Sequence, residues 1–185
     1  MNPALHKATR ELQSDWPGTE SIETARLTLE ALRVEHTDEM RLVLGDQAVY
    51  TYIGGGPPSV EELRARYERQ MENQSPGGSH GWLNWIVRER ETQLAIGTVQ
   101  ATLQGAPGRL SAELAWVIGV AHQGRGYATE AASALVSWLR RHEVNAFAAH
   151  IHPEHGASEG VAVRIGLIAT DGMLDGERRW TSTGV

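Results

Sequence analysis

A strand, a glycine-rich turn and a helix follow one another with no spare residues between them at positions 112–139. Leu114, Trp116 and Ile118 alternate with other residues, which is the two-residue period of a strand with two distinct faces. The turn at residues 123–128 reads Gln-Gly-Arg-Gly-Tyr-Ala. Beyond it, apolar residues recur at intervals of three and four, as on one face of a helix: Ala128, Ala131, Ala132, Leu135, Val136 and Leu139. The turn therefore forms a helix N-terminus directly after a strand.

A helix N-terminus placed in this way suits an anion. It presents backbone N–H groups without intrahelical partners, together with the positive end of the helix dipole. Gly124 and Gly126 leave no side chain in the way of a diphosphate, and Arg125 adds a positive charge. Two glycines between a strand and a helix are also ordinary turn residues. The turn taken alone leaves both interpretations open.

The pattern Gln-x-x-Gly-x-Ala, with Tyr-Ala-Thr-Glu-Ala running into the helix, resembles the acetyl-CoA loop of the GNAT N-acetyltransferases. The similarity runs from about residue 23 to residue 180, and it is strongest to the RimJ/RimL-like branch, which acetylates the N-terminal residue of ribosomal proteins. The Rossmann pattern fits less well because Thr129 replaces its third glycine, and no P-loop lysine follows. The resemblance implies that acetyl-CoA contacts Ile118, Val120, Gln123, Gly124, Arg125, Gly126, Tyr127, Ala128, Thr129 and His155.

The alternation of elements predicts an α/β (α+β) protein. We expect a mixed, mostly antiparallel sheet of six or seven strands with about four helices, and Ser59 as the N-cap of the second helix. The V-shaped opening between the central strand and the next is implied by the GNAT resemblance alone. The predicted strands cover residues 27–31, 82–88, 94–103, 112–119 and 145–151, and the predicted helices cover residues 36–44, 60–72, 127–139 and a segment that ends at 165.

The length of 185 residues allows one domain with a sizeable core, which we place at residues 22–185. Residues 1–21 are expected to form an arm that is either a short helix or disordered. The chain shows neither a run of eighteen apolar residues nor a secretory signal, so we expect a cytoplasmic protein without a membrane partner, either a monomer or a homodimer. A net charge of −6 argues against nucleic acid as a general partner.

A second motif, His-Pro-Glu-His-Gly-Ala-Ser at residues 152–158, precedes a further helix and the pair Gly166-Leu167. It resembles the GNAT signature His-Pro-x-Asn-x-x-Ser followed by Gly-Phe, with His155 and Leu167 as departures. In the family the asparagine binds the cofactor, and a neutral imidazole can donate one such hydrogen bond. His155 could instead be an exposed residue at the helix entrance. The histidines show no metal-ligand spacing, and we expect no metal.

Acetyl transfer requires a base for the amine, a donor for the developing oxyanion and a proton for the CoA thiolate. Glu113 lies where RimJ/RimL-like proteins often carry a glutamate near the amine, which makes it the candidate base; a solvated strand-end carboxylate is the other interpretation. The tyrosine acid of many GNAT enzymes is replaced by Ala162. Ser158 becomes the candidate acid, although it could simply cap its helix. The oxyanion donor is expected to be a backbone N–H near Ile118.

Four aromatic residues are candidate contacts for the amine acceptor: Tyr50, Tyr52, Trp85 and Trp116. Tyr50 and Tyr52 could equally be packing residues. Because the chain contains no cysteine, we expect direct transfer from acetyl-CoA to a primary amine. Two alternatives remain: a CoA-responsive regulatory module without catalysis, and an acetyltransferase acting on aminoglycosides or polyamines.

Overall fold

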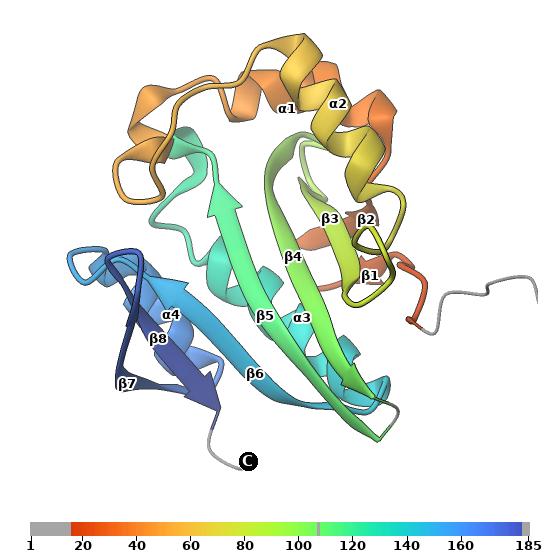
Figure 1. Ribbon diagram of the computed structural model, residues 1–185. Coiled ribbons are helices and arrows are strands. Elements are labelled where there is room, and N and C mark those ends of the chain that lie inside the picture. Colours follow the sequence, from red (N-terminus) through yellow and green to blue (C-terminus); the bar gives the residue numbers. More distant parts are fainter. Residues whose placement is uncertain (1–15, 107, 183–185) are drawn as a thin grey trace, which may run out of the picture.

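The computed structural model describes residues 16–106 and 108–182 (Figure 1). Within these residues the chain forms one sheet of eight strands, in the order β1-β2-β3-β4-β5-β6-β8-β7. Every neighbouring pair is antiparallel except β5 and β6, which are parallel. The strands are β1 (Ile22–Glu23), β2 (Leu27–Ala31), β3 (Gly81–Glu89), β4 (Ala95–Ala106), β5 (Arg109–Ile118), β6 (Val144–Ile151), β7 (Leu167–Leu174) and β8 (Glu177–Ser182).

In the described part of the chain, four α-helices flank this sheet, and three short 3-10 segments connect its elements. The α-helices are α1 (Thr37–Val43), α2 (Val60–Gln70), α3 (Tyr127–Arg141) and α4 (Gly156–Arg164), and the 3-10 segments are η1 (Val34–His36), η2 (Gln47–Tyr50) and η3 (Val120–His122). In Figure 1, α3 and α4 lie behind the sheet, while α1 and α2 lie at one end of it. The predicted N-cap of α2 is confirmed, because the Ser59 hydroxyl accepts a hydrogen bond from the Glu62 amide at 3.1 Å.

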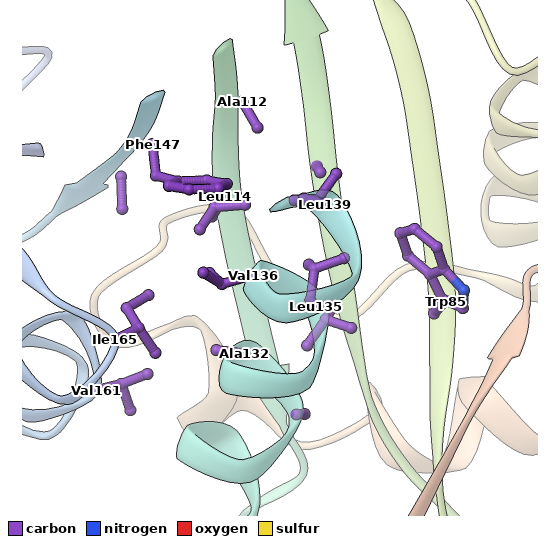
Figure 2. Packing of buried hydrophobic residues seen from close by; sticks show 14 of the residues in the cluster. Trp85, Ala112, Leu114, Ala132, Leu135, Val136, Leu139, Phe147, Val161 and Ile165 are labelled. Carbon is purple, nitrogen blue, oxygen red and sulfur yellow. The ribbon is translucent and has the colours of Figure 1, made fainter. Parts of the chain in front are cut away.

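The larger hydrophobic core lies between α3, α4 and one face of the sheet. Figure 2 shows side chains of α3 pointing toward strand residues such as Leu114 and Phe147, with Val161 and Ile165 nearby. A second cluster lies under α1 and α2 on the opposite face and includes Met40, Leu63 and Ile86. The apolar period of three and four in α3 and the alternation in the strands produce these two faces, as predicted.

Trp85 corrects one sequence expectation. Its side chain is only 1% exposed in the larger core, where its ring meets that of Trp138 edge-on, with centroids 5.3 Å apart. Its indole N–H donates to the Glu20 carbonyl at 2.8 Å, and the Trp138 indole N–H donates to the Glu20 carboxylate at 2.7 Å. The prediction that Trp85 contacts an acceptor is therefore wrong, because the alternation of β3 turns it toward α3.

The expected fold class is confirmed, whereas the expected six or seven strands become eight in the described residues. The strands that the sequence did not locate are the two-residue β1 and the hairpin of β7 and β8. β7 shows no two-residue alternation of apolar side chains, and most of its residues are exposed. Of the predicted N-terminal arm, residues 1–15 lie outside the described residues. Residues 16–21 form no helix, and Trp16 packs against the larger core.

Leu135→Ala should lower the free energy of unfolding by about 2–5 kcal/mol, because Leu135 is 1% exposed between α3 and the sheet and its truncation leaves a cavity. Denaturant unfolding followed by circular dichroism would measure the loss. Leu42→Ala is the matched control: Leu42 is 82% exposed on α1, so the same truncation should change stability by less than about 0.5 kcal/mol. Equal effects of the two variants would contradict this assignment of the core.

Candidate active site

The parallel strands β5 and β6 pair over only part of their length. Their register runs from Leu110 opposite Val144 to Glu113 opposite Ala148 and then stops. β5 continues to Ile118 on the β4 side, and β6 continues to Ile151 against β8. The two strands therefore diverge beyond Glu113, as Figure 1 shows. The V-shaped opening expected in the sheet is present.

The glycine-rich turn lies at the end of β5 and begins α3. Gly124 and Gly126 have φ angles of +74° and +77°, in the left-handed region that favours glycine. Gly126 is the N-cap of α3. The first-turn N–H groups of any helix lack an intrahelical acceptor, and here no side chain caps them either. The Gln123 side chain donates to the Ile118 carbonyl at 2.8 Å and ties the turn to the strand end.

A cavity of about 610 Å³ extends from this turn into the opening beside α4. Eight of the predicted cofactor residues line it: Ile118, Gln123, Gly124, Gly126, Tyr127, Ala128, Thr129 and His155. Two predicted residues do not line it: Val120 in η3, and Arg125, which is exposed in the turn. The structure thus gathers most of the predicted loop around one cavity, the cofactor cavity.

Arg26 is a residue of this cavity that the sequence analysis did not assign. Its guanidinium makes an ion pair with Glu130 at 2.7 Å, donates to the Arg125 carbonyl at 3.0 Å and lies over the Tyr127 ring. The Tyr127 hydroxyl in turn donates to Glu89. Arg26 directly precedes β2 and is distant in sequence from the glycine turn, so only the fold brings it to this cavity.

Thr24 and Arg26 together stabilise the charged form of Glu130 in the first turn of α3. Burial alone raises the pKa of Glu130, but hydrogen bonds from Thr24 and Arg26 outweigh it, and the net shift is downward. Glu130 is therefore an anion beside a site expected to hold diphosphate. The ion pair with Arg26 offsets the repulsion that this carboxylate would otherwise exert.

A second cavity, of about 310 Å³, lies on the other side of the opening and is called the acceptor cavity below. Its lining includes Glu113, Tyr52 and His150. It shares five lining residues with the cofactor cavity: Ile53, Trp116, Val117, His155 and Ser158. The two cavities therefore meet at the point where β5 has left β6.

Ser158 lies at this junction, in the first turn of α4. The Trp116 indole N–H donates to its hydroxyl oxygen at 3.3 Å, so the hydroxyl hydrogen remains available for another acceptor. The structure therefore brings Trp116 and Ser158 together and places both on each cavity.

Glu113 lies where the pairing of β5 with β6 ends, and its side chain is 52% exposed. His150, two residues beyond the partner of Glu113 on β6, places its Nδ1 3.0 Å from the carboxylate. Because an ionised carboxylate can only accept, Nδ1 carries the proton in this hydrogen bond. The sequence analysis missed His150, which could be found only once the register of β5 and β6 was known.

The two tyrosines of the loop before α2 have different positions. The Tyr52 ring stacks on the His155 ring with centroids 4.5 Å apart, at the acceptor cavity. Tyr50 instead donates its hydroxyl to the Leu44 carbonyl at 3.0 Å, packs against the second cluster and lines neither cavity. The packing interpretation therefore fits Tyr50.

Burial, followed by the nearby His152, lowers the pKa of His155 and favours its neutral form.

Comparison with known proteins assigns the chain to a family. Residues 26–168 match the family model for the acetyltransferase (GNAT) domain. The chain belongs to the GNAT acetyltransferase family. A relative from Bacillus subtilis (strain 168), the uncharacterized protein YkkB, is 28% identical over 127 residues, which are 68% of this chain and 72% of YkkB. Members of the GNAT family use acetyl-CoA.

Solved structures share this GNAT fold. RimL, a ribosomal L7/L12 alpha-N-protein acetyltransferase solved with coenzyme A, has 18% identity and a TM-score of 0.70, covering 88% of this chain and 97% of RimL. An acetyltransferase from Agrobacterium tumefaciens str. C58 has 25% identity and a TM-score of 0.67, covering 91% and 97%. The RimL likeness shows a common fold.

Residues 16–106 and 108–182 contain neither a metal-ligand group nor a membrane-spanning helix. No group of three or more histidine, cysteine, aspartate or glutamate residues there is arranged to hold a metal ion. No helix in the same part of the chain is long and apolar enough to span a bilayer.

Gly126→Val should weaken acetyl-CoA binding by more than tenfold, or about 1.4 kcal/mol. Valine would strain a backbone held at φ +77° and would place a branched side chain at the cofactor cavity. Isothermal titration calorimetry would measure the affinity. Gly108→Val is the matched control, with φ +80° and open space around it, at the opposite end of β5. It should bind acetyl-CoA normally; equal affinity of both folded variants would exclude the glycine turn from the cofactor site.

Proposed function

We propose that this GNAT protein transfers an acetyl group from acetyl-CoA directly to a primary amine, the N-terminal amine of a peptide or protein. The junction of the two cavities carries this proposal, because one cavity begins at an uncapped helix N-terminus and the other contains a carboxylate. RimL, which shares the fold, acts on a protein N-terminus according to its name, and this supports the choice of acceptor.

In this proposal the cofactor lies along the cofactor cavity. Its diphosphate is held by the first-turn N–H groups of α3, and its pantetheine arm enters the opening between β5 and β6. The thioester is then at the junction beside Ser158. A backbone N–H of β5 near Ile118 stabilises the oxyanion that forms on the thioester carbonyl. His155 is the proposed replacement for the family asparagine.

Glu113 is the proposed base, and His150 orients its carboxylate through the 3.0 Å hydrogen bond. The amine nitrogen attacks the thioester carbon and gives its proton to Glu113, directly or through water. The carbon–sulfur bond then breaks, and Ser158 donates its hydroxyl proton to the departing thiolate. The Trp116 N–H, which donates to the serine oxygen, stabilises the charge left on that oxygen until the proton held by Glu113, relayed by water, restores the hydroxyl.

The hydrogen bonding of Ser158 also argues against an acetyl-serine intermediate. A serine nucleophile needs a base that accepts its proton, as histidine does in a catalytic triad. Its partner here is instead an indole N–H, which donates to the oxygen and lowers its nucleophilicity. A neutral amine held beside the thioester needs no such activation. The contact therefore favours direct transfer, in agreement with the absence of cysteine.

The proposal includes the domain organisation, oligomeric state and location that were expected from the sequence. Residues 22–185 act as one catalytic domain, as a monomer or homodimer in the cytoplasm, where acetyl-CoA is available. The regulatory alternative has less support, because the acceptor cavity holds groups suited to catalysis on the side where an amine would enter. The two carboxylates of the acceptor cavity, Glu113 and Glu177, suit any cationic amine, and the fold shared with RimL favours a peptide N-terminus over aminoglycosides or polyamines.

Glu113→Gln should lower the turnover number by about a hundredfold or more, because the amide cannot take the proton of the amine. Release of CoA from acetyl-CoA and an N-terminal peptide, followed with a thiol reagent, would measure turnover, and calorimetry should show nearly unchanged acetyl-CoA affinity. Glu91→Gln, an exposed substitution in the β3–β4 turn, is the control and should retain full activity. Turnover within about threefold of the parent in Glu113→Gln would remove Glu113 as the base.

A further inference from the structure

The face of the sheet opposite α3 carries polar side chains in register across three strands. Trp82 on β3 lies opposite Thr102 on β4, which lies opposite Glu113 on β5. In the adjacent row, Asn84 lies opposite Gln100. Neighbouring strands are about 4.8 Å apart, so the first row extends about 10 Å from Glu113 to Trp82. A polar path therefore leads away from the proposed base across the sheet.

Two arginines of α2 lie at the far end of this path. Arg66 and Arg69 are three residues apart, which places them on one side of the helix. With Trp82 and other residues of the polar rows, they line a cavity of about 210 Å³, the arginine cavity. Neither guanidinium makes an ion pair or a hydrogen bond to any described residue, and no acidic residue lines the cavity. Both charges are therefore available to an anion.

Asn84 also lines the arginine cavity. Its side-chain amide has no hydrogen-bond partner among the described residues, and its polar atoms are not among the buried ones, so the amide is open to the cavity. A ligand in the cavity could therefore form hydrogen bonds with it without breaking an existing one. The amide can both donate and accept, which suits a peptide backbone.

The arginine cavity continues into the acceptor cavity through Gln100, which lines both. The acceptor cavity contains two carboxylates, Glu113 and Glu177, and no arginine or lysine lines it. The path is therefore acidic where the amine would react and basic at its far end, where the two arginines line the cavity beside Trp82, about 10 Å from Glu113 along the sheet. An acceptor matching both ends carries a cationic amine and an anion at that separation.

We propose that the acceptor is a peptide N-terminus with an anionic side chain about 10 Å from its amine, held by Arg66 and Arg69. An extended chain advances about 3.4 Å per residue, so the backbone of the third residue lies about 7 Å from that of the first. Its side chain covers the remaining distance, and the anion therefore belongs to the third residue of the peptide. The side chains of Asn84, Gln100 and Thr102 hold the intervening backbone. This inference rests on the proposed acetyl transfer and specifies the acceptor for the same site.

Two peptides that differ only in aspartate or asparagine at position three test the proposal. The aspartate peptide should have a kcat/KM about tenfold higher in the parent protein. Combined Arg66→Gln and Arg69→Gln should remove this preference by raising KM for the aspartate peptide alone, leaving kcat and the asparagine peptide unaffected. Both arginines are exposed, so folding should be retained. Arg64→Gln, on the same helix but outside the cavity, is the matched control and should keep the preference.

Calorimetric binding of the two peptides to the CoA-loaded protein separates this inference from the proposed function. Tighter binding of the aspartate peptide, lost in the double arginine variant, supports the anion site even if no acetyl group is transferred. Equal affinity of both peptides in the parent protein would overturn it, whatever the catalytic activity. A third peptide, with phosphoserine at position three, identifies the preferred anion. If it binds more tightly than the aspartate peptide, the site prefers a phosphoryl group; if it binds less tightly, the site prefers a carboxylate.

Discussion

The parallel pairing of β5 with β6 ends at Glu113 and Ala148, and the proposed chemistry depends on this early end. Full pairing would close the sheet between the cofactor cavity on one side and the acceptor cavity on the other. Because the strands diverge, Trp116 and Ser158 line both cavities. The same divergence leaves Glu113 at the last paired position, partly exposed and within reach of His150. The early end of the β5–β6 ladder therefore positions the proposed base, the proposed acid and the junction of the two cavities.

Packing on either side keeps this opening in place. α3 covers one face of the sheet with an almost continuous apolar surface, and the paired rings of Trp85 and Trp138 join it to β3. The first turn of α3 is left without a capping side chain, while the Arg26 ion pair with Glu130 connects it to β2. The rigid core thus holds an unsatisfied helix N-terminus against the widest part of the opening, where an anionic cofactor can use it.

The sequence predicted the parts of this structure that depend on local patterns. The strand, glycine turn and helix at residues 112–139, and the N-cap at Ser59, follow from periodicity and capping chemistry and are present. The direction of individual side chains and the register between strands were harder to predict from the sequence. Trp85 was assigned to the acceptor but points into the core. The positions of His150 and of the Arg66–Arg69 pair depend on contacts with elements that are distant in sequence, so the sequence alone did not predict them. Residues 167–182 lack the two-residue alternation of apolar side chains, and this concealed the β7–β8 hairpin.

The central claim is that acetyl-CoA and the amine are present together at the Trp116–Ser158 junction and react without an acetylated enzyme. Initial rates measured over a grid of acetyl-CoA and peptide concentrations test it most directly. Direct transfer within a ternary complex predicts double-reciprocal lines that intersect. Parallel lines would show that acetyl-CoA reacts and CoA leaves before the amine binds. That result would contradict the account and would make Ser158 the nucleophile.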